Sequence, residues 1–197
     1  MERPSYKPLM QTAISSAGCF VFDTHNPTPV RVDSPALEVM TDLSRIPAAT
    51  VSPDDSLPEA NQSMLLRGVR LLLVAGGEDR IRGVITANDL LGEKPVLVAR
   101  NNGIRRSELR VSDVMTSVEH MEVLALDDVA KAEVGHVVAT LKADGRMHAL
   151  VVEEQNGHQV LRGIFSASQI ARQLGVQVVT HETARTFAEI EAAISGI

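Results

Sequence analysis

The chain has 197 residues, of which 44% are hydrophobic and 22% charged, and its formal net charge at pH 7 is -6. This length allows one domain or two small domains with a buried core, and the composition is that of an ordinary globular protein. Tryptophan is absent, and the chain has one tyrosine and four phenylalanines. Few aromatic side chains are therefore available for stacking on bases, and the negative charge opposes binding to a phosphate backbone. We expect no nucleic-acid partner.

The single cysteine, Cys19, excludes an intramolecular disulfide and a metal site built from several cysteines. It fits a reducing compartment. No apolar run approaches the ~18 residues that cross a membrane. The six histidines lack the spacing of metal ligands, so no metal is expected. These features predict a soluble cytoplasmic protein without a membrane partner.

Taken in chain order, residues 1–33 contain four prolines and are predicted to form an extended arm. The rest of the chain contains an internal repeat. EVMT (38–41) returns as DVMT (113–116), RLLLV (70–74) as HALVV (148–152), and RGVIT (82–86) as RGIFS (162–166). The order of the segments is preserved while their spacing drifts by a few residues, as loop insertions would cause. The simplest interpretation is two copies of one unit of ~60 residues.

Each copy predicts the same series of elements. After the VMT motif comes a short strand, and then a helix whose apolar positions repeat with helical spacing. These positions are Leu57, Ala60, Met64 and Leu65 in the first copy, and Val134, Val137, Val138 and Leu141 in the second. An aliphatic hairpin follows, turning at Gly76-Gly77 or at Asn156-Gly157. A short helix after each hairpin ends at Gly92 or Gly175, in the position after the last helical residue.

The predicted fold class is α+β, with each repeat forming a small three-stranded sheet and two helices. One such unit is too small to be stable alone, so two should pack sheet to sheet. The repeats are assigned to 34–96 and 111–175, joined by a linker at 97–110, with an amphipathic tail at 176–197. In this tail, Phe187, Ile190 and Ile194 share one helical face. This face is expected to pack on its own domain or against a partner.

The segment GVITANDL (83–90) and its repeat GIFSASQI (163–170) allow two interpretations. A hydroxyl residue followed three positions later by Asp, Glu or Gln resembles a capping box, in which the two side chains satisfy free backbone donors at a helix start. Alternatively, Thr86 and Asp89 could hold the ribose-phosphate of a nucleotide, since a carboxylate can accept two hydrogen bonds from a ribose diol. In the second copy, Ser166 and Gln169 fit the cap, but the amide has one acceptor oxygen and no charge.

With these motifs in the same order twice, the chain resembles a stand-alone tandem CBS-domain protein, a Bateman module. The resemblance covers the two repeats and includes TVSPDDSLPEA (50–60). It implies two repeats related by a pseudo-two-fold axis, with a cleft that binds adenosine derivatives such as AMP, ADP, ATP or S-adenosylmethionine. The implied function is regulatory: the module senses the nucleotide and transmits its binding through a homodimer or an unidentified protein partner.

The resemblance also implies roles for individual residues. Thr86 would contact phosphate or ribose, and Asp89 the ribose hydroxyls. Ile46 and Ala48 would flank the adenine, with Thr50 nearby. Arg70 and His148, before the second strand of each repeat, would reach the phosphates, or they are solvated charges at a strand edge. Because Gln169 replaces the carboxylate, Ser166 and Gln169 are expected to form the cap but not to accept both hydrogen bonds of a ribose diol. We therefore expect one principal ligand per chain.

No catalytic motif stands out. There is no Gly-x-Ser-x-Gly and no P-loop, since Gly92-Glu93-Lys94 is followed by Pro95. We therefore expect no enzyme and no required cofactor, with an adenine nucleotide as the regulatory ligand. Two alternatives stay open. In one, the chain is a structural or protein-interaction module whose Thr86–Asp89 and Ser166–Gln169 pairs serve only as caps; in the other, it is an enzyme with an unrecognised site.

Overall fold

The computed structural model describes residues 10, 29–77, 80–176 and 183–195. The first half contains η1 (Ala36–Val39), β1 (Thr41–Asp42), β2 (Thr50–Val51), α1 (Leu57–Arg67), β3 (Leu71–Ala75), β4 (Ile81–Thr86), α2 (Ala87–Leu91) and α3 (Lys94–Asn102). The connection contains η3 (Arg106–Glu108) and α4 (Val111–Val114). The second half contains β5 (Thr116–Ser117), η4 (Val118–His120), β6 (Val123–Ala125), α5 (Leu126–Val129), α6 (Val134–Ala143), β7 (His148–Gln155), β8 (His158–Ser166), α7 (Ala167–Gln173) and α8 (Thr183–Ser195).

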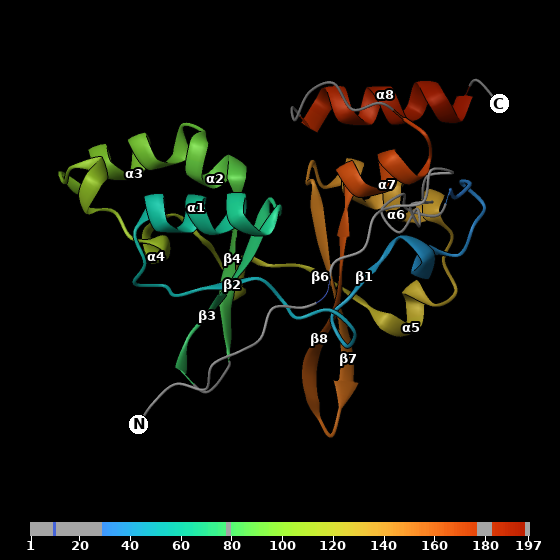
Figure 1. The fold of residues 1–197 in the computed structure, drawn as a ribbon, viewed down its shortest axis with the longest axis horizontal. Coiled ribbons are helices and arrows are strands. Elements are labelled where there is room, and N and C mark those ends of the chain that lie inside the picture. The colour runs from blue at the N-terminus through green and yellow to red at the C-terminus, as the bar shows by residue number, and fades with distance from the viewer. Residues whose placement is uncertain (1–9, 11–28, 78–79, 177–182, 196–197) are drawn as a thin grey trace.

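Two sheets, each covered by its own helices, lie beside one another (Figure 1). Their strand orders are β2-β3-β4-β5 and β1-β8-β7-β6. Between the sheets, Leu71 and Leu73 of β3 form a buried cluster with Leu150 of β7. The expected α+β fold with two repeats packed sheet to sheet is therefore confirmed. Each sheet, however, has four strands where three were expected.

The fourth strand of each sheet comes from the other repeat. β1 pairs antiparallel with β8, placing Thr41 opposite Ile164. β5 pairs antiparallel with β4, placing Thr116 opposite Val84. These strands are the threonine ends of the two VMT motifs. Their two-residue length leaves no periodic pattern in the sequence, which is why the exchange was not predicted.

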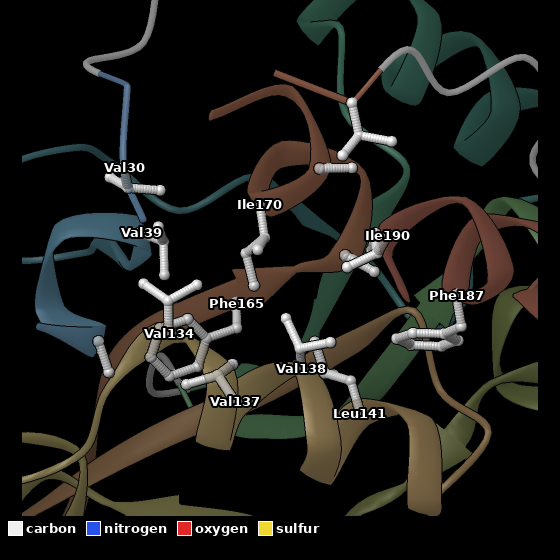
Figure 2. Close-up of a cluster of buried hydrophobic side chains, with 14 of the residues drawn as sticks. Val30, Val39, Val134, Val137, Val138, Leu141, Phe165, Ile170, Phe187 and Ile190 are labelled. Carbon is white, nitrogen blue, oxygen red and sulfur yellow. The ribbon is translucent and has the colours of Figure 1, made fainter. Parts of the chain in front are cut away.

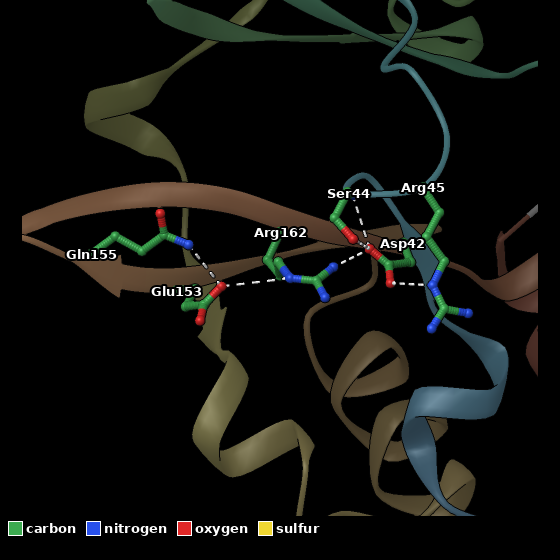
Figure 3. Close-up of polar contacts among 6 residues, drawn as sticks. All are labelled: Asp42, Ser44, Arg45, Glu153, Gln155 and Arg162. Carbon is green, nitrogen blue, oxygen red and sulfur yellow. Dashed lines mark hydrogen bonds and ion pairs between the residues drawn. The ribbon is translucent and has the colours of Figure 1, made fainter.

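A polar network holds the exchanged strand β1 on the second sheet (Figure 3). The Asp42 carboxylate accepts hydrogen bonds from the Ser44 hydroxyl and backbone N–H, at 2.7 and 2.9 Å, and from the Arg162 guanidinium on β8. The Ser44 hydroxyl and N–H, together with Arg162, lower the pKa of Asp42 to about 2. Glu153 on β7 lies 3.5 Å from Arg162 Nε. The network therefore joins residues 42–44 of the first repeat to two strands of the second.

Gly83 and Gly163, the first residues of the two repeated segments, leave room for the exchanged strands. A Cβ at Gly83 would lie 2.3 Å from the backbone oxygen of Thr116 on β5, a distance that real Cβ atoms do not adopt. A Cβ at Gly163 would lie 2.4 Å from Met40 Sδ, next to β1. The glycine in GVITANDL and GIFSASQI is thus explained by close approach of the other repeat's VMT segment.

The helix and hairpin predictions agree with the structure in most details. Ser56 and Glu59 form a complete capping box at the start of α1. All four apolar residues predicted for α6 are buried. Leu65 was expected on the core face of α1, but 73% of it is exposed, because Leu57, Ala60 and Met64 already define the buried face. The second hairpin turns through Asn156 and Gly157, both with positive φ, as a type I′ turn requires.

The two glycines expected after the short helices differ in conformation. Gly175 follows α7 with φ 76°, the left-handed conformation expected of a helix-ending glycine. Gly92 follows α2 in an extended conformation and donates its N–H to the Asn88 carbonyl oxygen, at 2.9 Å. The prediction is therefore right for Gly175 and wrong for the backbone of Gly92. The expected linker, 97–110, contains most of α3 and the short helix η3.

The core of the second repeat includes the C-terminal helix (Figure 2). Phe187 and Ile190 of α8 are buried together with Leu141 of α6 and Ile170 of α7. Of the two alternatives for this helical face, packing on its own domain is the one observed. The side chain of Ile194, residues 177–182 and most of the N-terminal arm lie outside the described residues. Within the arm, the Val30 N–H donates to the Gln173 carbonyl oxygen at 3.0 Å.

Candidate functional site: a pocket between the repeats

A cavity of about 300 Å³ lies between the two sheets. Both repeats contribute to its wall. The first repeat contributes Arg70, Leu71, Val84, Thr86, Asn88 and Asp89, and the second contributes Thr116, Met121, Glu122, Arg146, His148 and Leu150. Four of the sequence-predicted residues, Arg70, Thr86, Asp89 and His148, therefore line one pocket. Apolar and polar groups are both present, as in small-molecule sites.

Ile46, Ala48 and Thr50 do not line this pocket. Segment 41–46 follows β1 onto the second sheet, where the Leu43 N–H donates to the Arg162 carbonyl oxygen at 3.0 Å. Ile46 is 54% exposed, and Ala48 packs at the edge of the cluster between the sheets. Thr50 lies in β2 opposite Leu73. The structure therefore does not bring these three residues together with Thr86 and Asp89: the exchanged strand β1 carries segment 41–46 onto the second sheet, and Thr50 lies in β2, on the far side of β3 from β4.

Met121 and Glu122 of the second repeat line the pocket where Ile46, Ala48 and Thr50 were expected. The parallel pairing of β6 on β7 places Val123 opposite Leu150, as the pairing of β2 on β3 places Thr50 opposite Leu73. Met121 is thus the structural counterpart of Ala48. Sequence reasoning missed both residues because it placed the cleft between the repeats but took the residues around the adenine from the first repeat alone. A sequence signal was present, since each VMT motif precedes such a segment.

Thr86 and Asp89 form a complete capping box at the start of α2. The Thr86 N–H and hydroxyl both donate to Asp89 Oδ2, at 2.9 and 2.7 Å. The Asp89 N–H donates in return to Thr86 Oγ1, at 3.2 Å. The other carboxylate oxygen, Oδ1, accepts from Lys94 Nζ at 2.9 Å. The cap interpretation is confirmed, and Lys94 is an additional partner that the sequence did not single out.

Ser166 and Gln169 do not form the expected cap. Ser166 precedes α7 without any side-chain hydrogen bond to the helix. Gln169 Oε1 instead accepts a hydrogen bond from the Thr41 hydroxyl on β1, at 3.3 Å. The prediction that the second copy keeps its cap is wrong, because the exchanged strand provides a different partner for the amide. Gln169 is therefore a contact between the repeats.

The difference between the two caps predicts unequal effects of removing their hydroxyls. We expect Thr86→Ala to lower the free energy of unfolding by about 1–2 kcal/mol, the usual cost of losing an N-terminal cap. We expect Ser166→Ala to change it by only a few tenths, because its side chain caps nothing. Urea denaturation of the two variants and the unmodified protein checks this. Equal losses would contradict the assignment of the cap to the first repeat alone.

His148 faces the pocket because of a one-residue difference in register. The sequence alignment paired it with Arg70. In the structure, His148 lies opposite Ser166 as Leu71 lies opposite Thr86. Likewise the Ala167 N–H donates to the Met147 oxygen, as the Ala87 N–H donates to the Arg70 oxygen, each at 2.9 Å. His148 is thus the counterpart of Leu71, whose side of the sheet faces the other repeat.

This position alters the acid–base properties of His148. Burial, with a smaller contribution from the nearby positive charge of Arg70, lowers the pKa of His148 from 6.5 to about 4. The imidazole is therefore neutral at physiological pH and can both donate and accept a hydrogen bond. A neutral imidazole beside a permanently charged guanidinium suits a polyanionic group.

Among the described residues of the pocket wall, Arg70 is a basic residue without a hydrogen-bonding or ion-pair partner. Two other basic groups are engaged with acids: Lys94 with Asp89, and Arg146 with Glu122 at 3.2 Å. In the described part of the chain, no hydrogen bond or ion pair engages the Arg70 side chain. Its guanidinium is half-buried beside the cavity. An anion in the pocket would therefore find a free planar donor group.

Among the described residues, no three His, Cys, Asp or Glu side chains are grouped so that they could hold a metal ion. None of the helices in the described ranges is long and apolar enough to cross a membrane.

The fold and the pocket between its halves define the class, a module built from two α+β repeats. Residues 36–95 match the family model described as CBS domain, so this part of the chain is a CBS domain. The second repeat is recognised from its matching elements and register. A search of curated proteins finds no match.

Solved structures support the same fold. An uncharacterized conserved protein from Pyrococcus horikoshii is similar with a TM-score of 0.54 and 22% identity, over 77% of this chain and 99% of that one. A CBS-domain protein of unknown function from Thermoplasma acidophilum has a TM-score of 0.50 and 15% identity, over 78% of this chain and 76% of that one. CBSX2, solved in complex with AMP, has a TM-score of 0.49 and 20% identity, over 71% of this chain and 94% of that one. Because the identities are below 25%, the similarities to the P. horikoshii and T. acidophilum proteins show the fold alone.

Proposed function

We propose that this protein binds an adenine nucleotide in the pocket between its repeats, and that the bound nucleotide regulates a partner protein or a second copy of the chain. The observation that carries the proposal is the guanidinium of Arg70, which has no partner among the described residues, beside the neutral imidazole of His148, both lining the cavity. These groups offer donors to a phosphate. Thr86 and Asp89 lie along the same wall, in reach of a ribose attached to that phosphate.

The apolar part of the pocket suits a base. Leu71, Val84 and Leu150 are contributed by β3, β4 and β7, and Met121 by the segment before β6. A thioether packs well against an aromatic ring because it is polarizable and flexible. Since the wall comes from both repeats, a bound ligand would contact both sheets. Its binding free energy then favours one relative arrangement of the repeats over others, which is the physical requirement for a regulatory response.

A second candidate is a structural or protein-interaction module without a small-molecule ligand. The observation in its favour is the state of Asp89, whose two carboxylate oxygens are engaged by Thr86 and Lys94. In this alternative, the Thr86–Asp89 cap stabilises α2 and has no further role. The two candidates differ in one respect that can be measured directly, namely whether any nucleotide stabilises the folded protein.

We expect AMP, ADP, ATP, S-adenosylmethionine or NAD to raise the melting temperature. A ligand at 100 times its dissociation constant adds about 2.7 kcal/mol to the free energy of unfolding. For the ligands that carry a phosphate, the shift should largely disappear in Arg70→Gln, because the phosphate loses its guanidinium partner. It should persist in Arg67→Gln, since Arg67 is an exposed residue in the last turn of α1, outside the pocket. Differential scanning fluorimetry of the three proteins makes the comparison.

Two outcomes would favour the second candidate. One is a melting temperature that no compound shifts in the unmodified protein. The other is a shift that Arg70→Gln and Arg67→Gln retain equally, because the ligand would then bind outside the described pocket.

A further inference from the structure

Lys94 occupies one of the two oxygens with which Asp89 would hold a ribose diol. Its Nζ lies 2.9 Å from Asp89 Oδ1 and 3.4 Å from the Met115 carbonyl oxygen, just before β5. Asp89 Oδ2 already accepts two hydrogen bonds from Thr86. A carboxylate oxygen has two lone pairs, so Oδ2 is saturated and Oδ1 retains one free position. As it stands, Asp89 can accept one more hydrogen bond, and a diol offers two.

The ammonium can leave while the backbone stays in place. Lys94 is the first residue of α3, and the next residue, Pro95, is buried, as is Ala99 one turn later. The lysine side chain is 39% exposed and the Asp89 side chain 17% exposed. The lysine stem can therefore rotate toward solvent, where its charge is hydrated. Asp89 cannot follow, because Thr86 holds its other oxygen.

We propose that Lys94 is an internal competitor for the ribose-binding carboxylate, and that it determines how strongly the pocket selects ligands with a ribose diol. The inference rests on the proposed function. The diol of a bound nucleotide takes Asp89 Oδ1, and the ammonium moves into solvent. The affinity for the diol is thereby reduced by the interaction that Lys94 gives up. Ligands without the two hydroxyls leave the Lys94–Asp89 pair intact.

The first experiment measures the affinities of AMP and 2′,3′-dideoxy-AMP by calorimetry, for the unmodified protein, Lys94→Met and Lys131→Met. Methionine keeps an unbranched stem and removes the charge. Lys131 is an exposed lysine outside the pocket, so its variant controls for the loss of one positive charge. We expect Lys94→Met to raise the preference for AMP over the dideoxy compound about tenfold, the usual scale of one hydrogen bond to a charged group. Lys131→Met should leave this preference unchanged.

The second experiment detects the released ammonium. Trace acetylation with acetic anhydride, followed by peptide mass spectrometry, compares Lys94 with Lys131 and Lys142 in the same molecule. Lys142 is paired with Glu191 of α8, away from the pocket, and serves as a second reference. We expect AMP to increase labelling of Lys94 several-fold and to leave the other two unchanged. The dideoxy compound should increase none of them.

The outcomes separate this inference from the proposed function. If the unmodified protein binds AMP, but Lys94→Met binds AMP and the dideoxy compound with unchanged or equally changed affinities, only the Lys94 inference is overturned. The same holds if Lys94→Met weakens AMP alone, because the ammonium would then assist the ligand. If neither AMP nor its dideoxy analogue binds to any of the proteins, both proposals fall.

Discussion

We expect Gly83→Ala to lower the free energy of unfolding by about 3 kcal/mol, at the upper end of the range for overpacked core positions. The added methyl group would lie 2.3 Å from the Thr116 backbone oxygen. Because this atom belongs to a strand paired in register with β4, the clash is relieved only by moving the backbone of β5 or β4. Urea denaturation followed by circular dichroism measures the loss.

Gly163→Ala is the matched control. Its methyl group would meet Met40 Sδ at 2.4 Å, but methionine has three rotatable bonds and can move aside. We expect a loss of about 1 kcal/mol. Equal losses in the two variants would show that the exchanged strand adjusts as easily as a side chain. Thr116 also lines the pocket, so the Gly83 variant should bind nucleotide more weakly at a temperature where it remains folded.

Between pH 6.5 and about 4, we expect His148 to remove about 2 kcal/mol of stability. Its pKa is lowered in the folded protein from 6.5 to about 4. The unfolded chain therefore binds a proton in this window that the folded protein does not, and unfolding becomes more favourable as the pH falls. Above pH 6.5, the residue has no such effect. The full shift corresponds to a larger value, which partial contact with solvent reduces.

The test is the pH dependence of unfolding from pH 6.5 to 4.5. His148→Gln should flatten it, while His158→Gln, at an exposed position of β8, should not. The Asp42 carboxyl, with its pKa near 2, loses its stabilising contribution only below about pH 3.8, outside this range. A bound phosphate near His148 would favour the protonated imidazole, so the affinity for AMP of the unmodified protein, relative to that of His148→Gln, should increase as the pH falls through the same window. An unchanged slope in His148→Gln would contradict the buried position.

The elements with a strong local pattern were predictable. The turn at Asn156-Gly157 depends on neighbouring residues alone, and so does the Thr86–Asp89 cap. The register of the aliphatic strands was not. Leu71 to Val74 are all buried, so no alternation of apolar and polar residues shows which of them face the pocket. A shift of one residue moves every side chain to the opposite face of the sheet. The sequence therefore left two alternatives open for His148, a residue that faces the pocket and a solvated charge at the strand edge.

The remaining errors concern contacts between residues far apart in the chain. Gln169 was expected to cap α7, and its partner is Thr41, 128 positions away. Met121 entered the pocket in place of Ala48 for the same reason, the exchange of β1 and β5. Lys94 was missed because its role depends on where α3 begins. Neither its type nor its spacing from Asp89 signals an ion pair, because Lys94 follows Gly92, where the short helix was expected to end.

The exchange of edge strands has a consequence for synthesis on the ribosome. Asp42 and Arg162, which hold β1 on the second sheet, are 120 positions apart. The first sheet lacks its β5 edge until residues 116–117 leave the exit tunnel, and β1 has no partner strand until β8 emerges. Such late closure is slow, because the chain must bring distant segments together before their contacts form. The nascent first repeat therefore emerges with an unpaired β4 edge, which chaperones that bind exposed strands can reach until β5 pairs with it.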